Sequence, residues 1–88
     1  MEDYLGLIEM FAGNFAPVGY MLCDGSLLPI NQYQAVFSIL GTTYGGDGRT
    51  TFALPDLREV HPSDKSKYWN PDKPRWIMCV QGIFPSRN

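Results

Sequence analysis

The clearest periodic pattern lies between Asn31 and Leu40, where apolar side chains recur at the spacing of one helical face. The residues of that face are Tyr33, Val36, Phe37 and Leu40. Asn31 and Gln34 have the spacing of a capping box, in which two side chains satisfy backbone N–H groups at the start of a helix. Gly41 follows where a helix commonly ends with a positive φ. The pattern predicts a helix over 31–40 with its apolar face on the core.

Three apolar stretches without helical spacing predict β-strands. They are Leu5–Phe11, Tyr20–Cys23 and Arg75–Phe84. Glu9 is the one charge in the first stretch, so we expect it at a solvent-facing or edge position. In the last stretch both faces are largely apolar, which indicates burial on both sides. We expect the helix to cover one face of this strand and a neighbouring subunit to cover the other.

These elements predict an α+β fold, a small single domain over residues 1–88 with about three short β-strands, one α-helix and long Gly/Pro-rich ordered loops. Nine glycines and seven prolines account for the many turns. A chain of 88 residues buries only about 60–65% of its unfolded surface. Because its own core is thin, we expect a homo-oligomer whose copies share a hydrophobic interior.

The segment Thr42–Thr51 is rich in glycine, which raises the question of phosphate binding. Neither a P-loop nor a dinucleotide-binding spacing occurs there, and the loop leaves a helix instead of opening one. We expect its glycines to permit turns with positive φ, while Tyr44 and Phe52 pin the loop to the core.

Charge and hydropathy exclude several classes of partner. The formal charge is −2 with scattered basic residues, so the chain lacks the electrostatic footprint of a protein that binds nucleic acid or an anionic membrane. No apolar stretch approaches the roughly 20 residues of a membrane span. The acidic N-terminus lacks the basic region of a signal peptide, which predicts cytoplasmic synthesis without Sec export.

The reactive side chains indicate a protein that is not an enzyme and that needs no metal or cofactor. Cys23 and Cys79 lie in apolar segments, where two buried thiols are favoured over a disulfide. His61 stands beside a proline in a polar loop, without the companions of a catalytic triad. The aspartates beside Gly or Pro are expected to cap turns with their own side chains. These are Asp24, Asp47 and Asp56.

A series of motifs, in order along the chain, resembles the phage tail collar domain family, which includes the microcystin-dependent-protein group and relatives of short tail fibres. The motifs are Met10-Phe11-Ala12-Gly13, Pro17-x-Gly19-Tyr20, Cys23-Asp24-Gly25, Leu28-Pro29-Ile30, Leu40–Asp47, Phe52-x-Leu54-Pro55-Asp56-Leu57-Arg58 and Gln81–Asn88. The resemblance implies a structural component of a phage tail or phage-derived particle, assembled into a virion tail with other tail or fibre proteins. It implies a homo-oligomer, with a trimer favoured, and a docked C-terminal tail. Arg58 and Arg87 are expected to hold contacts between segments or subunits.

The sequence departs from the family in the variable loop at 59–74, which is much shorter than in most members. Tyr68 and Trp69 lie in this loop, where aromatic rings could stack on a sugar or anchor a protein interface. Packing over the loop or against a neighbouring subunit is an equal alternative. A second candidate binding set is Tyr44, Asp47 and Arg49. The single histidine and the absence of a His-x-His pair give no support for metal-dependent receptor binding.

The function predicted from these observations is structural and adhesive: a component of a tail fibre that self-assembles and contacts a cell-surface glycan or protein receptor. The alternative is a free-standing bacterial protein-interaction module derived from a tail collar domain. A hydrolase acting on a cell-surface polymer is disfavoured, since no catalytic constellation is present in the sequence.

Overall fold

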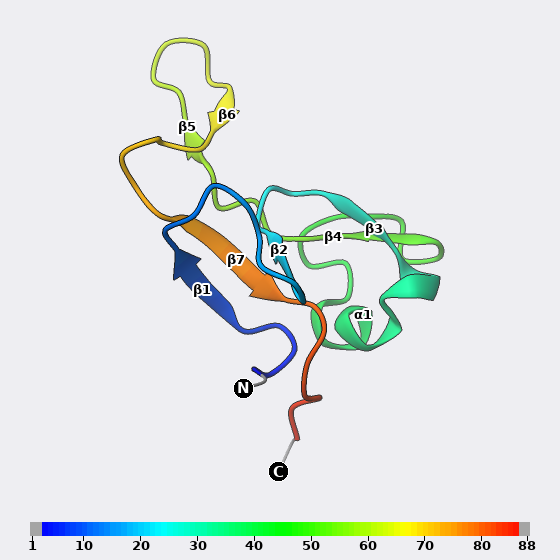
Figure 1. Cartoon of the computed structure of the whole chain (residues 1–88). Helices are drawn as coiled ribbons and strands as arrows, with labels where there is room; N and C mark the ends of the chain where they lie inside the picture. The colour runs from blue at the N-terminus through cyan, green and yellow to red at the C-terminus, as the bar shows by residue number, and fades with distance from the viewer. Residues whose placement is uncertain (1–2, 87–88) are drawn as a thin grey trace.

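The computed structural model describes residues 3–86, which form one α-helix, one 3₁₀ helix and seven short strands in three small antiparallel sheets (Figure 1). The α+β fold class is therefore confirmed. No helix in the described part of the chain is long and apolar enough to cross a membrane.

The largest sheet places the last strand in its centre. Its order is β1 (Ile8–Phe11), β7 (Arg75–Cys79), β2 (Tyr20–Leu22). All three predicted strands are confirmed, but each is shorter than predicted. The first begins late because Leu7 N–H closes a turn onto Tyr4 O at 3.1 Å.

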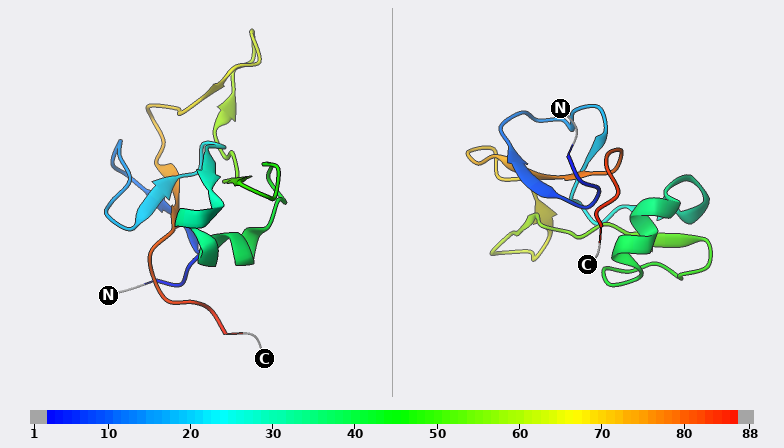
Figure 2. Two further views of the ribbon diagram at one scale, coloured as in Figure 1. Left: turned by 90° about the vertical axis from the view of Figure 1, so that its right-hand side faces the viewer. Right: turned by 90° about the horizontal axis from the view of Figure 1, so that it is seen from below.

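The expectation that a neighbouring subunit must cover one face of β7 is wrong. Ile77 and Met78 point to opposite faces of the strand, yet only 4% and 1% of their surfaces are exposed within the single chain. The connection between β1 and β2 crosses the face that lies away from α1 (Figures 1 and 2). Glu9 is exposed on the edge strand β1, as predicted. Burial of β7 therefore gives no evidence about oligomeric state.

The predicted helix is divided into two parts. A 3₁₀ helix, η1 (Ile30–Gln32), precedes α1 (Gln34–Leu40), and the predicted capping box is not formed because neither helix has a side-chain cap. Ile30 N–H donates instead to Thr50 O at 2.9 Å, which ties the start of the segment to the end of the glycine-rich loop. Gly41 ends α1, as predicted, and has a positive φ of +58°, but its ψ of −145° is not that of a left-handed helical residue.

The core lies between α1, the three-stranded sheet and the pair β3 (Leu27–Pro29) and β4 (Thr51–Ala53). Its buried residues are Leu5, Cys23, Leu28, Val36, Phe52, Leu54, Met78 and Val80. The predicted helix face contributes directly, since Val36 is buried and the other three members pack against this cluster. Phe52 is buried as predicted, and its ring centroid lies 5.4 Å from that of Phe37.

Two segments extend from this body at opposite ends (Figure 1). The predicted variable loop contains a hairpin of β5 (Glu59–Val60) and β6 (Lys67–Tyr68), which we call the distal hairpin, residues 59–68. At the other end the C-terminal segment docks on the N-terminal one, where Leu5 N–H donates to Ile83 O at 2.8 Å and Ile83 N–H to Asp3 O at 2.9 Å. The predicted docking thus extends to Ile83, whereas Phe84 is 55% exposed. Arg87 and Asn88 lie outside the described residues.

Both cysteines are buried thiols, as predicted. Burial, together with the neighbouring charge of Asp24, raises the pKa of Cys23 to about 11. The Cys79 thiol lies within reach of two backbone carbonyls, at 3.4 Å from Gln81 O and 3.7 Å from Asp3 O. Neither environment is that of a reactive thiolate.

Candidate functional site

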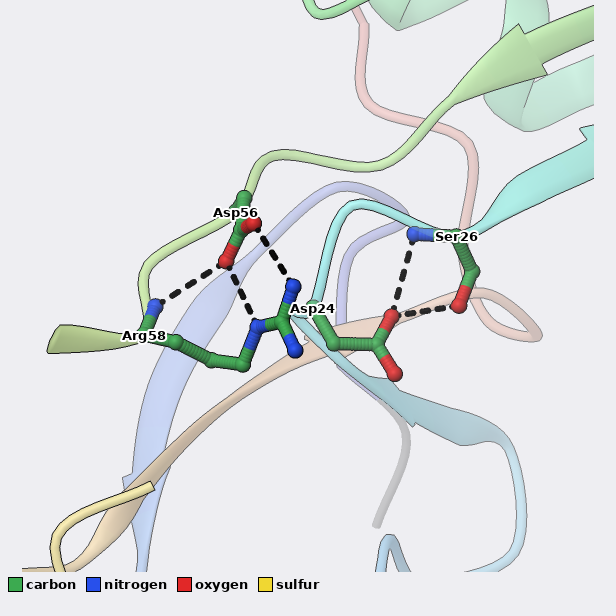
Figure 3. A network of polar contacts seen from close by, with 4 residues as sticks. All are labelled: Asp24, Ser26, Asp56 and Arg58. Carbon is green, nitrogen blue, oxygen red and sulfur yellow. Dashed lines mark hydrogen bonds and ion pairs between the residues drawn. The ribbon is translucent and has the colours of Figure 1, made fainter. Parts of the chain in front are cut away.

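Two of the predicted turn aspartates organise adjacent loops. Asp24 Oδ1 accepts the backbone N–H of Ser26 at 3.0 Å and also its hydroxyl (Figure 3). Asp56 accepts two bonds from the Arg58 guanidinium, at 3.0 and 2.9 Å, and one from the Arg58 backbone N–H at 3.2 Å. The guanidinium holds the pKa of Asp56 below its usual value. Arg58 therefore pairs within its own motif and not between segments.

The two loops are bonded to each other through their backbones. Leu57 N–H donates to Cys23 O at 2.9 Å, and Gly25 N–H donates to Pro55 O at 3.2 Å. Gly25 has φ +79°, and a Cβ there would lie 3.2 Å from the Asp56 side chain. We call this unit, formed by Asp24, Ser26, Asp56 and Arg58, the aspartate staple. Its polar groups are used internally, so it serves to hold the fold.

The glycine loop, residues 42–51, is organised by Asp47. Its Oδ1 accepts backbone N–H groups from Arg49, Thr50 and Thr51 at 2.8–2.9 Å, and its Oδ2 accepts the Thr50 hydroxyl at 2.9 Å. These donors hold the pKa of the Asp47 carboxyl far below its usual range. The turn-capping role predicted for Asp47 is confirmed, and little of the carboxylate is left for a ligand.

The other members of the second candidate set are not gathered around Asp47. Tyr44 is 50% exposed, so the prediction that it pins the loop to the core is wrong. Arg49 lines an open cavity of about 440 Å³ beside Asn31 and Gln34, and neither Tyr44 nor Asp47 contributes to that cavity. Arg49 is therefore the member of this set that lines a cavity.

Tyr68 and Trp69 are neighbours in sequence but have different surroundings. The Tyr68 ring packs edge-on against His61 inside the distal hairpin, with 5.7 Å between centroids. Trp69 lies under the guanidinium of Arg75, whose Cζ is 5.7 Å from the ring centroid. Tyr68 therefore follows the structural alternative, whereas Trp69 stands at the base of the hairpin.

Trp69 lines a cleft of about 250 Å³ between the base of the distal hairpin and the three-stranded sheet. We call it the tryptophan cleft. Its apolar wall consists of Met10, Leu57, Trp69, Pro74 and Trp76. Its polar lining is supplied by Glu59, Asn70 and Lys73. Lys73 Nζ lies 3.6 Å from Glu59 Oε1, so the two charges offset each other.

Sequence reasoning missed every cleft residue except Trp69. The sequence places Trp76 in the buried final strand and Met10 in the first strand. They lie together because β1 and β7 pair with Met10 opposite Trp76. Alternation along the two stretches places these residues on a common face only if the antiparallel register is known.

His61 has two polar neighbours, but their arrangement is not that of a triad. Ser63 Oγ lies 2.8 Å and Asp64 Oδ1 3.5 Å from the same ring nitrogen, Nδ1. A catalytic histidine bonds its nucleophile and its carboxylate through different nitrogens. Within residues 3–86 no group of three or more His, Cys, Asp or Glu side chains is placed to hold a metal ion.

The model of the family described as Phage Tail Collar Domain matches residues 6–62, which is more than half of the chain. The match contains the aspartate staple and the glycine loop, and it ends before Trp69 and β7. No curated protein matches the chain.

Proposed function

Since the chain belongs to the phage tail collar domain family, we propose that it is a structural component of a phage tail fibre or of a phage-derived tail particle. The observation that carries this proposal is the family match, and the aspartate staple agrees with it. Two motifs that the sequence shares with the family form one internally bonded unit, as a mechanical part requires.

In this proposal the end that carries the termini mediates self-assembly into a homotrimer. Several large apolar side chains are exposed on the paired N- and C-terminal segments, and Tyr4 and Ile83 form a parallel bridge there. These side chains are Tyr4, Leu7, Ile83 and Phe84, which are 41–56% exposed. Apolar side chains that are exposed on two segments paired with each other are typical of a surface that is covered in the assembled protein.

The opposite end is proposed to be the adhesive one. The distal hairpin extends from the body away from both termini (Figure 1; Figure 2, left). A projecting loop with an aromatic cleft at its base is the usual position of a contact surface on a rigid scaffold. The apolar end thus joins copies of the chain while the hairpin end meets a cell-surface receptor.

Light scattering after size exclusion tests the assembly. We expect a trimer for the natural chain and a monomer for Phe84→Glu, because a buried carboxylate without a partner opposes association. Val60→Glu is the matched control, since Val60 is 50% exposed on the distal hairpin. A natural chain that stays monomeric at every concentration, or a trimer that survives Phe84→Glu, contradicts this interface.

Antibody labelling tests the location. Particles purified from the source culture and labelled with antibody against the chain should show label on tails by electron microscopy. Label confined to the soluble fraction of the cell contradicts the tail assignment and favours an interaction module.

A further inference from the structure

The two tryptophans of the chain meet in a single cleft. Trp69 follows the distal hairpin and Trp76 belongs to β7, and both line the tryptophan cleft. Met10 and Leu57 complete the apolar wall while remaining 50% and 39% exposed. An apolar wall of this kind, open to solvent and formed by two indoles, can receive the carbon face of a ring.

The polar lining suits a ligand with hydroxyl groups. Asn70 Oδ1 accepts Asp72 N–H at 2.9 Å, which orients the side chain, and its Nδ2 has no partner among residues 3–86. Lys73 and Glu59 form an ion pair across 3.6 Å. Amide and ammonium groups donate hydrogen bonds, whereas carboxylate oxygens accept them, so hydroxyl groups can be bound in both roles.

Charge and size restrict the ligand further. The two charged residues that line the cleft, Glu59 and Lys73, form an ion pair, so the lining itself has no net charge with which to select an anionic or cationic ligand. The Arg75 guanidinium lies on the Trp69 ring and is not part of the lining. Its volume of about 250 Å³ lies just below the roughly 300–1,000 Å³ of sites for drug-sized ligands. The cleft therefore suits one ring and not an extended chain.

We propose that the tryptophan cleft binds a single neutral pyranose, the terminal sugar of a cell-surface glycan. A pyranose has an apolar carbon face for the indoles and a rim of hydroxyls for Asn70, Lys73 and Glu59. This inference rests on the proposed adhesive function and assigns it a ligand class. Arg75 over Trp69 fixes the orientation of the indole before the sugar arrives, which lowers the ordering cost of binding.

The test uses the two indole N–H resonances of the isotope-labelled chain. Because the chain has two tryptophans and both line the cleft, these signals report on that site. We would titrate with methyl glycosides of glucose, galactose, mannose and N-acetylglucosamine, and with methyl glycosides of a sialic acid and glucosamine as charged comparisons. Saturable shifts of both indoles with at least one neutral glycoside, and tighter binding of it than of the charged sugars, are expected.

Variants then assign the contact to Trp69. Trp69→Ala should weaken binding at least about tenfold, equivalent to ~1.4 kcal/mol, and Trp69→Phe by about threefold because a smaller ring remains. Phe15→Ala is the matched control, because Phe15 is an exposed aromatic that does not line the cleft, and it should bind as the natural chain does. Amide spectra verify that each variant is folded. If Trp69→Ala loosens the hairpin, Trp69→Phe and the natural chain still decide the question.

The outcomes separate this inference from the proposed function. If the chain forms trimers and is located on tails by antibody labelling while its indole resonances shift with none of the neutral glycosides, that result overturns the sugar site alone. Indole signals that shift with protein concentration but not with sugar overturn it too, because the cleft is then covered by a second copy. Tighter binding of the sialic acid or the glucosamine glycoside overturns the assignment to a neutral ligand.

Discussion

The glycine loop and the distal hairpin are both exposed connections, but they are bound to the body in different ways. In the glycine loop Gly45 O accepts the N–H of Ala53 in β4 at 3.0 Å, so the loop is bonded directly to a core strand. The backbone hydrogen bonds within the distal hairpin, such as His61 N–H to Ser66 O at 2.7 Å, join its own residues to each other. Individual backbone hydrogen bonds in the two regions have similar lengths. What differs is whether breaking them also exposes the core.

This difference separates two uses of irregular structure. The glycine loop should open only when the whole domain unfolds, whereas the hairpin should open by itself. A receptor-binding element gains from the second behaviour because it can adjust on contact, while a trimer scaffold needs the first. The following predictions test whether the two regions behave as separate units.

The largest effect is expected for Gly46→Ala in the glycine loop. Gly46 has φ +94°, and a Cβ there would lie 2.4 Å from the Cα of Phe52. Backbone strain and a clash with a core strand should together lower the free energy of unfolding by at least about 3 kcal/mol. Denaturant titration measures this loss in the free energy of unfolding. Gly41→Ala is the control, because Gly41 has φ +58° and ψ −145° but no atom within 4 Å of an added Cβ, and a smaller loss of about 1–3 kcal/mol from backbone strain alone is expected. Equal losses would contradict the close approach.

The requirement for Gly46 shows where sequence reasoning stops. Local patterns correctly predict the apolar helix face around Val36 and the burial of the last strand, because periodicity alone determines which side of an element faces the core. The turn role of Asp47 also follows from residue type. Nothing local indicates that Gly46 touches the backbone of Phe52, since that contact depends on how the loop folds back.

Contacts that depend on how the chain folds back also explain why the sequence does not predict the sheet of β3 and β4 or the tryptophan cleft. The strand Leu27–Pro29 has three residues, too few to show alternation, and it exists because Phe52 stands opposite Leu28. The sequence identifies Trp69 as a loop aromatic, but its partner Trp76 reaches it through the turn at residues 70–74, where Lys73 N–H donates to Asn70 O. The prediction for Tyr44 is wrong because aromatic character predicts burial on average and not at one position.

Hydrogen exchange of native amides compares the two regions directly. The Ala53 amide, bonded to Gly45 O, should exchange by global unfolding. The His61 and Lys65 amides, bonded within the hairpin, should exchange at least about 100-fold faster after correction for intrinsic rates, a difference of ~2.8 kcal/mol. Equal protection factors would show that the hairpin and the core open together.

Acid titration compares one aspartate from each region. Backbone donors lower the pKa of Asp47 and of Asp64 in the folded chain. A lowered folded pKa contributes stability above the unfolded pKa near 4, and this contribution is lost as the pH falls below that value. Asp47→Asn should therefore reduce the free energy of unfolding at pH 7, with the deficit shrinking below about pH 4. Asp64→Asn should leave global unfolding unchanged at both pH values, because the hairpin opens before the core unfolds. A matching deficit in both variants contradicts independent opening.

The smallest effect is expected for Lys65→Gly at the tip of the hairpin. Lys65 is the non-glycine residue with positive φ, +66°, among residues 3–86. Glycine removes the strain of about 1 kcal/mol but adds freedom to the open hairpin, so a net gain of a few tenths of a kcal/mol is expected in local protection. Exchange of the His61 amide, whose N–H is bonded to Ser66 O, should slow by up to about twofold, with the free energy of global unfolding unchanged.

Lys67→Gly in β6 is the control. It should raise the exchange rate of the same amide, because glycine in an extended strand only weakens the strand. A change in global stability on Lys65→Gly would mean that the hairpin belongs to the same cooperative unit as the glycine loop.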